Sequence, residues 1–123
     1  MRFTLDARSD INLIRGYGPG AVRVGDRVVT QHFILAADAL ITEWDVPSAA
    51  ELSLEHLAPI FELNPEVVLL GTGDAQRFPS AAVRAAFASR GIGLETMDLG
   101  AACRTYNILA QEERRVVALL FVR

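Results

Sequence analysis

The sequence predicts an α/β fold, in which one domain of three layers holds a mixed β-sheet with helices and an added N-terminal β-hairpin layer. Two short, wholly apolar runs at residues 67–70 and 116–122 are typical of strands that are buried on both faces. Helical patterns alternate with strands between them, whereas the first third is rich in β signals and lacks a helix. The 123 residues suffice for one core and are too few for two, so we expect residues 1–123 to form a single domain.

The first third predicts a β-meander. Residues 1–11 are a mixed lead-in with a candidate edge strand at residues 3–5. Residues 17–20, Tyr-Gly-Pro-Gly, predict a turn, because glycine allows positive φ and proline fixes its own φ. Residues 21–24 and 27–29 predict a hairpin around a Gly-Asp turn. A second antiparallel pairing is expected between residues 32–35 and 39–44.

The middle of the chain predicts one short helical region within residues 49–62. Ser48 with Glu51 fits a capping box, and Ser53 between apolar neighbours fits a competing helix start. Pro59 lacks the backbone N–H and clashes with the preceding turn, so the helix is expected to break or kink there. An Asn-Pro pair at residues 64–65 closes the region.

The second half predicts two β-α-β units. A strand at 67–70 leads to a helix at 80–90, which Ser80 caps and Gly91 ends. A strand at 92–97 leads to a helix at about 99–112, with Asp98 as its cap, and a last strand at 116–122. Such crossovers place the three strands parallel to one another.

Composition excludes several classes of site. The twelve basic residues are all arginine, which excludes Schiff-base lysines and the lysine of a phosphate loop. A single cysteine, Cys103, excludes an internal disulfide and a CxxC pair, and the two histidines form no metal motif. We therefore expect no cofactor and no metal. A net charge of −3 argues against nucleic-acid binding. No apolar window is long enough to cross a membrane, and the first twenty residues resemble no targeting signal, so we expect a cytoplasmic protein.

The segment after the first parallel strand is the first candidate site. Gly71, Thr72 and Gly73 are expected to form a turn after the strand at 67–70, and Arg77 and Phe78 precede the next helix. Glycines let the backbone approach a ligand closely, and a helix start favours an anion or a carboxylate. Arg77 would add a bidentate hydrogen-bond donor. The dinucleotide and phosphate-loop motifs are both absent, and the alternative is that the glycines only form a tight turn.

The last helix carries the second candidate cluster, Arg104, Thr105 and Asn107. Thr105 and Asn107 are unusual within a helix because their side chains compete for backbone hydrogen bonds. They are expected to face the turn at residues 71–73 across the strand ends. The alternative is that they bond neighbouring loop backbone and hold it in place. Cys103 is expected to be a buried thiol rather than a nucleophile, and no catalytic residue is assigned.

The runs EVVLLGTGDAQRFPS and GIGLETMDLGAACRTYNILAQEERRVVALLF resemble a small domain family of bacterial and archaeal stand-alone proteins. Its eukaryotic relatives include the mitochondrial respiratory complex I assembly factor three and an adipogenesis-associated protein. The resemblance covers nearly the whole chain. It implies a three-layer α/β fold and a protein-interaction or assembly role, with no catalytic residue to carry over.

Two functions remain open. The first is a non-enzymatic bacterial protein that binds a protein partner, such as a subunit of a membrane complex, without inserting into the membrane itself. The alternative is a small-ligand or anion-binding protein, or an enzyme, that uses residues 71–78 and the start of the last helix.

Overall fold

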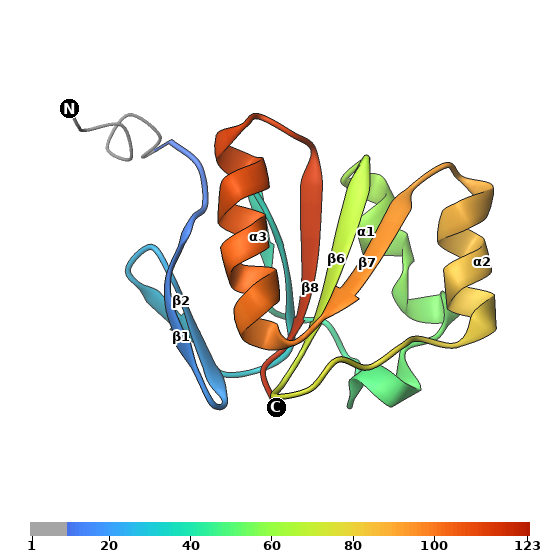
Figure 1. Ribbon diagram of the computed structural model, residues 1–123, viewed down its shortest axis with the longest axis horizontal. Helices are drawn as coiled ribbons and strands as arrows, with labels where there is room; N and C mark the ends of the chain where they lie inside the picture. Colours follow the sequence, from blue (N-terminus) through green and yellow to red (C-terminus); the bar gives the residue numbers. More distant parts are fainter. Residues whose placement is uncertain (1–9) are drawn as a thin grey trace.

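The computed structural model describes residues 10–123, so the strand expected at residues 3–5 lies outside the described part. A three-stranded antiparallel sheet comes first, in the order β1-β2-β3. Its strands are β1 (Ile14–Gly18), β2 (Ala21–Val24) and β3 (Arg27–Val29). The predicted hairpin is confirmed as β2 and β3, and β1 extends it by one strand (Figure 1).

The central sheet has five strands in the order β5-β4-β8-β6-β7. They are β4 (Phe33–Ala36), β5 (Ala39–Ile41), β6 (Val67–Thr72), β7 (Gly93–Met97) and β8 (Val116–Phe121). β6 pairs in parallel with both β7 and β8, whereas β4 is antiparallel to β5 and β8. The predicted mixed sheet, with its second antiparallel pairing and its parallel strands, is therefore confirmed.

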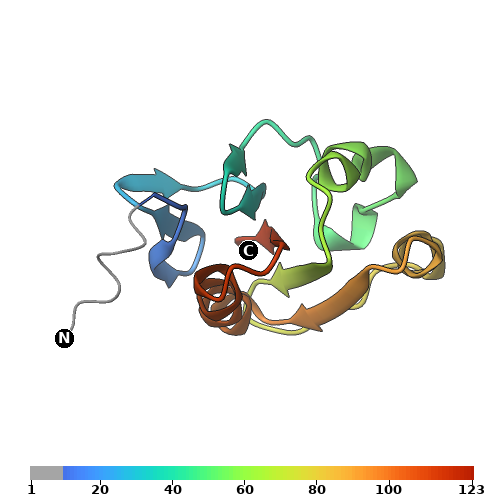
Figure 2. The ribbon, with the colours of Figure 1, turned by 90° about the horizontal axis from the view of Figure 1, so that it is seen from above.

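The central sheet is covered on both faces, which gives the predicted three layers. α3 (Leu99–Gln111) and the three-stranded sheet lie on one face, and α1 (Ala58–Glu62) and α2 (Ala81–Ser89) lie on the other (Figure 2). β8 divides between the two cores by strict alternation: Leu120 packs toward α3, while Leu119 packs toward the opposite core. Every residue of β8 is buried for this reason.

The caps of the two long helices are as predicted. The Ser80 hydroxyl oxygen accepts from the Val83 N–H at 3.2 Å and starts α2. The Asp98 carboxylate accepts from the Ala101 N–H at 2.8 Å and starts α3. Gly91, just after α2, has φ +71°, a conformation that costs glycine little.

The middle region differs from the prediction of one broken helix. It forms two 3₁₀ turns, η2 (Ala49–Glu51) and η3 (Leu54–His56), followed by α1. Pro59 does not break a helix, because it lies in the first turn of α1, where its missing N–H removes no helical hydrogen bond. The capping box of Ser53 is completed by His56, whose Nδ1 accepts from the Ser53 N–H at 2.9 Å.

Two strand boundaries were also predicted wrongly. Tyr17 and Gly18, assigned to a turn, belong to β1, and Gly71 and Thr72 continue β6. β1 has two glycines and no clear alternation, so its sequence carries no strand signal. Tertiary contacts hold it in place instead: the Asn12 amide donates to the carbonyls of Ala36 and Ala39 at 3.0 and 3.2 Å.

His32 predicts a pH-dependent stability. Its side chain is nearly buried, its Nδ1 accepts from the Val122 N–H at 3.2 Å, and its Nε2 lies 3.2 Å from the Pro47 carbonyl oxygen, so both ring nitrogens are used by the neutral form. Burial lowers the pKa of His32 most, the Arg123 charge lowers it further, and the Pro47 hydrogen bond opposes both.

The unfolded chain therefore takes up a proton at His32 more readily than the folded protein does. Stability should fall as the pH drops below about 6.5, by at most about 1.4 kcal/mol per pH unit, and be unaffected by His32 at higher pH. Urea unfolding of the wild type and of His32→Gln at several pH values tests this. If the free energy of unfolding changes equally with pH in the two proteins between pH 7 and pH 5, the prediction is refuted.

Candidate functional site

The carboxyl ends of the parallel strands meet at Gly73. The Gly73 N–H donates to the Phe121 carbonyl at 2.9 Å, and the Gly73 carbonyl accepts from the Leu99 N–H at 2.9 Å. Gly73 thereby joins the end of β6 to β8 and to the start of α3. Its φ of +46° and the Arg123 backbone, which would lie 3.3 Å from a Cβ, both favour glycine here. This edge is where ligands bind in open α/β sheets.

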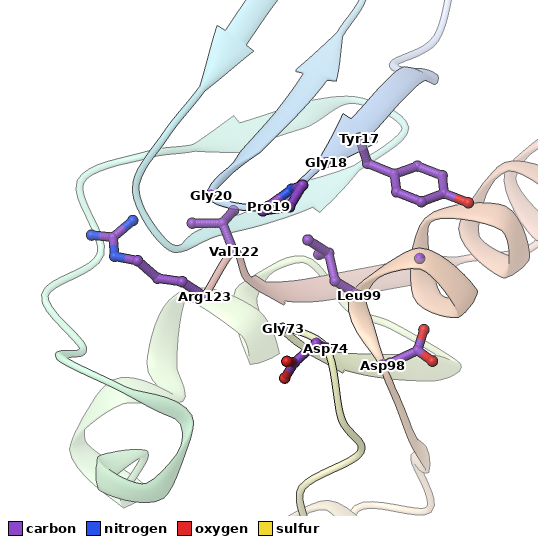
Figure 3. A pocket seen from close by; sticks show the side chains of 11 residues that line it. Tyr17, Gly18, Pro19, Gly20, Gly73, Asp74, Asp98, Leu99, Val122 and Arg123 are labelled. Atoms are coloured by element: carbon purple, nitrogen blue, oxygen red, sulfur yellow. The ribbon is translucent and has the colours of Figure 1, made fainter.

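A cavity of about 530 Å³ lies beside this junction, between the β1–β2 turn and the start of α3 (Figure 3). We call it the glycine cavity, because four glycines contribute to its lining: Gly18, Gly20, Gly73 and Gly100. Tyr17, Pro19, Leu99 and Val122 supply apolar surface. Its size is typical of small-molecule sites.

The charges of the glycine cavity differ from those expected of an anion site. Asp74 and Asp98 both line it, and the Arg123 side chain points away from them (Figure 3). The Arg123 Nη1 donates instead to the Thr30 carbonyl at 2.9 Å. One oxygen of Asp98 is already occupied by the Ala101 N–H. Arg77 and Arg104, the donors suggested by the sequence, are not part of this lining.

A second hollow of about 320 Å³, the Arg77 cleft, gathers four of the candidate residues. Thr72, Gly73, Arg77 and Phe78 line it together with Asp74, Arg123 and residues 48–50. The Thr72 hydroxyl donates to the Ala75 carbonyl at 2.5 Å and so shapes the loop after β6. Phe78 is 68% exposed, the largest exposed fraction among the large apolar side chains described.

Gly71 has a packing role in β6 rather than a role in a turn. It is buried, and a Cβ placed on it would lie 2.5 Å from the Cβ of Ala102 on α3. That distance is far below van der Waals contact, so a glycine lets α3 approach the sheet. Gly71 is therefore not available to a ligand at the rim.

The polar residues of α3 face β1, so the expectation that they face the turn at residues 71–73 is wrong. The Asn107 Oδ1 accepts from the Ile14 N–H at 2.8 Å, and its Nδ2 donates to the Ile14 carbonyl at 2.8 Å. Arg104 donates to the Tyr17 hydroxyl at 2.5 Å. Thr105 is half-buried on the same helix. The alternative prediction was that such side chains hold loop backbone in place, and Asn107 does hold backbone, but that of the first residue of β1 rather than of a loop.

Cys103 is a buried thiol, as predicted. Burial raises its pKa to about 12, and the nearby Arg104 charge opposes this only in part. A thiol with this pKa is protonated at neutral pH and is a poor nucleophile. Within residues 10–123, no three His, Cys, Asp or Glu side chains gather as they would around a metal ion.

Sequence reasoning missed much of the glycine cavity. Tyr17, Pro19 and Gly20 lie more than fifty residues from Gly73 in the chain, and the sheet topology alone brings them together. The one local signal for this wall is the Tyr-Gly-Pro-Gly run, which predicts a turn but does not indicate a site. Arg123 was missed because it carries no local motif.

The comparison with known protein families covers nearly the whole described chain. Residues 14–121, from β1 to the end of β8, match the family described as a protein of unknown function (DUF498/DUF598). The chain belongs to this family. The resemblance inferred from the glycine segment and the last helix is therefore confirmed, and the match spans both sheets and α3.

Relatives of this family member have names of two kinds. It is 32% identical over 110 residues to the zebrafish (Danio rerio) NADH dehydrogenase [ubiquinone] 1 alpha subcomplex assembly factor 3, covering 88% of this chain and 63% of that protein. The chain thus spans less than two thirds of that relative. It is 32% identical over 88 residues to a 13 kDa major membrane protein of Francisella tularensis, covering 71% of this chain and 72% of the relative.

The fold is also that of a solved relative. The NMR structure of a Xanthomonas campestris protein superposes with a TM-score of 0.84 at 43% identity, covering 94% of this chain and 87% of that one. Among the helices of residues 10–123, none combines the length and the apolar character that a bilayer-spanning segment needs.

Proposed function

We propose that this protein binds a protein partner and assists the assembly of a membrane-bound respiratory complex, without catalysing a reaction. Support comes from the relatives named as assembly factors of NADH dehydrogenase. The structural observation that carries the proposal is Phe78. This aromatic ring is 68% exposed and lines both the Arg77 cleft and a further hollow, which Ile92 and Leu94 also line.

An exposed aromatic ring that lines two hollows is suited to a protein interface. Aromatic and arginine side chains are enriched at protein interfaces, and Arg77 lies one residue away. Within the described chain, Arg77 makes no ion pair, so its charge is available to a partner. The proposed partner is a subunit of a membrane complex, and neither nucleic acid nor direct membrane insertion is part of the proposal.

Replacing Phe78 tests this surface. Phe78→Ser should weaken partner capture by about tenfold or more while leaving the melting temperature nearly unchanged, because the ring is exposed and contributes little to the core. The measurement is quantitative mass spectrometry of proteins that co-purify with the tagged chain from its host. Ile108→Ser is the matched control, since Ile108 is 56% exposed on α3, away from Phe78.

Recovery of respiratory-complex subunits with the wild type and with Ile108→Ser, but not with Phe78→Ser, would support the proposal. Equal recovery with all three proteins would remove Phe78 from the interface. The cytoplasm is the proposed location, and fractionation of host cells into cytosol and membrane tests it.

The glycine cavity favours a second candidate, a small-ligand protein. Its volume of about 530 Å³ fits a metabolite-sized molecule, and its two carboxylates favour a polar or cationic one over an anion. Screening small molecules by their effect on the melting temperature separates the two candidates. Gly18→Leu is the control. Gly18 lines the cavity and nothing lies within 4 Å of a Cβ there, so a leucine should fit without a clash and occupy space that a ligand needs.

A further inference from the structure

β7 is an open edge of the central sheet. The sheet order ends at β7, whose one neighbour is β6. The Gly93 N–H donates toward β6, to the Glu66 carbonyl at 3.2 Å. Because backbone groups alternate in direction along a strand, Glu95 and Met97 also point toward β6, and Leu94 and Thr96 point outward.

A side chain confirms this direction at the end of the strand. The Gln76 Nε2 donates to the Thr96 carbonyl at 2.7 Å and to the Thr96 hydroxyl at 3.0 Å. Gln76 thus supplies at one carbonyl the hydrogen bond that a neighbouring strand would supply along the edge. Within the described chain, no strand pairs with the outer side of β7 at Leu94.

A groove runs beside this edge. Its volume is about 330 Å³, and its lining consists of Phe78, Arg84, Ala88, Ile92, Leu94 and Thr96. We call it the β7 groove. Alternate residues of the strand form one wall, α2 forms the other, and Phe78 stands at the boundary with the Arg77 cleft. An open backbone edge beside pockets for alternate side chains is the arrangement that captures an extended peptide.

Charge sets the chemistry of that peptide. Arg84 is exposed on the α2 wall and makes no ion pair within residues 10–123, and Arg77 is likewise unpaired beyond Phe78. The wall on the strand side is apolar at Ile92 and Leu94. Resting on the proposed protein-binding function, we infer that the partner adds an extended segment to β7, with apolar side chains in the β7 groove and acidic side chains toward Arg84 and Arg77.

The test uses a defined probe rather than an unknown partner. The probe is a synthetic peptide of about seven residues, acetylated and amidated, in which every second residue faces the β7 groove. These positions are valine and glutamate in turn, so that both meet the groove and Arg84, and threonine fills the positions between them. NMR-detected hydrogen exchange in the full chain is the readout. At saturating peptide, the amide hydrogens of Leu94 and Thr96 should exchange about tenfold more slowly or better, whereas that of Glu95, which already points toward β6, should not change.

Two further peptides separate strand addition from mere contact. One is N-methylated at every threonine and the other at every valine and glutamate. An added strand uses the amides on one of its edges, so one of the two should lose binding and the other should keep it. A lysine-for-glutamate peptide should bind at least about tenfold more weakly, because Arg84 repels it.

Paired variants on α2 locate the site. Ala88→Arg places a long side chain in the β7 groove and should abolish protection of Leu94 and Thr96. Ala85→Arg is the matched control, because Ala85 lies on the same helix, is also exposed and is outside the groove lining. Both changes keep a good helix former on an exposed position, so both proteins should fold.

Several outcomes would overturn the inference. These are unchanged exchange at Leu94 and Thr96 at millimolar peptide, equal binding by both N-methylated peptides, or full protection in Ala88→Arg. Concentration-dependent protection of both amides without peptide would assign the edge to a second copy of the chain instead.

The two proposals fail separately. If Phe78→Ser loses respiratory-complex subunits in co-purification while Ala88→Arg retains them and the peptide gives no protection, the assembly role stands and strand addition falls. If the peptide protects Leu94 and Thr96 but no complex subunit is recovered, strand addition stands and the assembly role falls.

Discussion

Gly71→Ala should destabilise the protein by about 1–3 kcal/mol, the range for adding a methyl group to a packed core. The added Cβ would lie 2.5 Å from the Cβ of Ala102 and 3.2 Å from the Cδ2 of Leu120. Neither the helix nor the sheet can move alone, because Leu99 at the start of α3 is tied by its N–H to the Gly73 carbonyl at 2.9 Å. Urea unfolding, with the midpoint and slope compared to the wild type, gives the measurement.

Two controls show whether the contact with α3 causes the loss. Gly16→Ala, in β1, has nothing within 4 Å of its new Cβ and no positive φ, so it should leave the unfolding free energy within about 0.5 kcal/mol. Ala102→Gly removes the clashing methyl group and should recover part of the loss in the double variant, beyond its own effect. A Gly71→Ala protein as stable as Gly16→Ala would contradict the packing argument.

The role of Gly71 shows how far the sequence reaches. The apolar run before it predicts β6, and the two β-α-β units predict the parallel order of β6, β7 and β8, because periodicity and caps are local signals. The same run does not reveal that Gly71 lies against Ala102, since contact between a strand and a helix thirty residues later depends on how the layers pack. From the sequence alone, a glycine at the end of an apolar run therefore predicts a turn.

The candidate site also divides into residues whose grouping the sequence predicts and residues whose partners it does not indicate. Thr72, Gly73, Arg77 and Phe78 are close in the chain and line one cleft, as their spacing suggests. Arg104 and Asn107 were grouped with them because they follow the helix start. The helix turns them instead toward β1, a strand with no sequence signal of its own, so no pattern along the chain indicates their partner. Topology also brings Tyr17 to the glycine cavity.

The two hydrogen bonds between Asn107 on α3 and Ile14 in β1 lead to the second large expected effect, that of Asn107→Leu. One amide side chain satisfies both the N–H and the carbonyl of Ile14, each at 2.8 Å, across 93 residues of sequence. Leucine has similar volume but no hydrogen-bonding atom, so it leaves two partly buried backbone groups unpaired. Each such group costs about 1–3 kcal/mol when water cannot replace the partner, so two groups cost about 2–6 kcal/mol. Because both groups are only partly buried, the expected loss of unfolding free energy lies in the lower half of this range, at about 2–4 kcal/mol.

The loss should be local before it is global. Ile14 begins β1, and the register between β1 and β2 already shifts between Ile14 and Gly16. Without Asn107, β1 is held by β2, by the Asn12 contacts and by the hydrogen bond from Arg104 to Tyr17, so hydrogen exchange should rise first at β1 and only later in β6 and β8. Asn107→Asp is the informative companion, because its carboxylate can accept from the Ile14 N–H but cannot donate to the Ile14 carbonyl.

Asn107 also links the fold to the glycine cavity, because β1 carries Tyr17 and Gly18, two of the residues that line it. If the hydrogen bonds of Asn107 position this wall, Asn107→Leu should speed amide hydrogen exchange at Tyr17 and Gly18. Exchange of the Leu94 and Thr96 amides, at the far edge of the central sheet, should not change. The Thr105→Ala protein is the control on the same helix, since Thr105 is half-buried and lies two residues before Asn107. Uniform destabilisation of both edges in Asn107→Leu would mean that β1 and the central sheet unfold as one unit, and that Asn107 contributes to overall stability without setting the cavity wall.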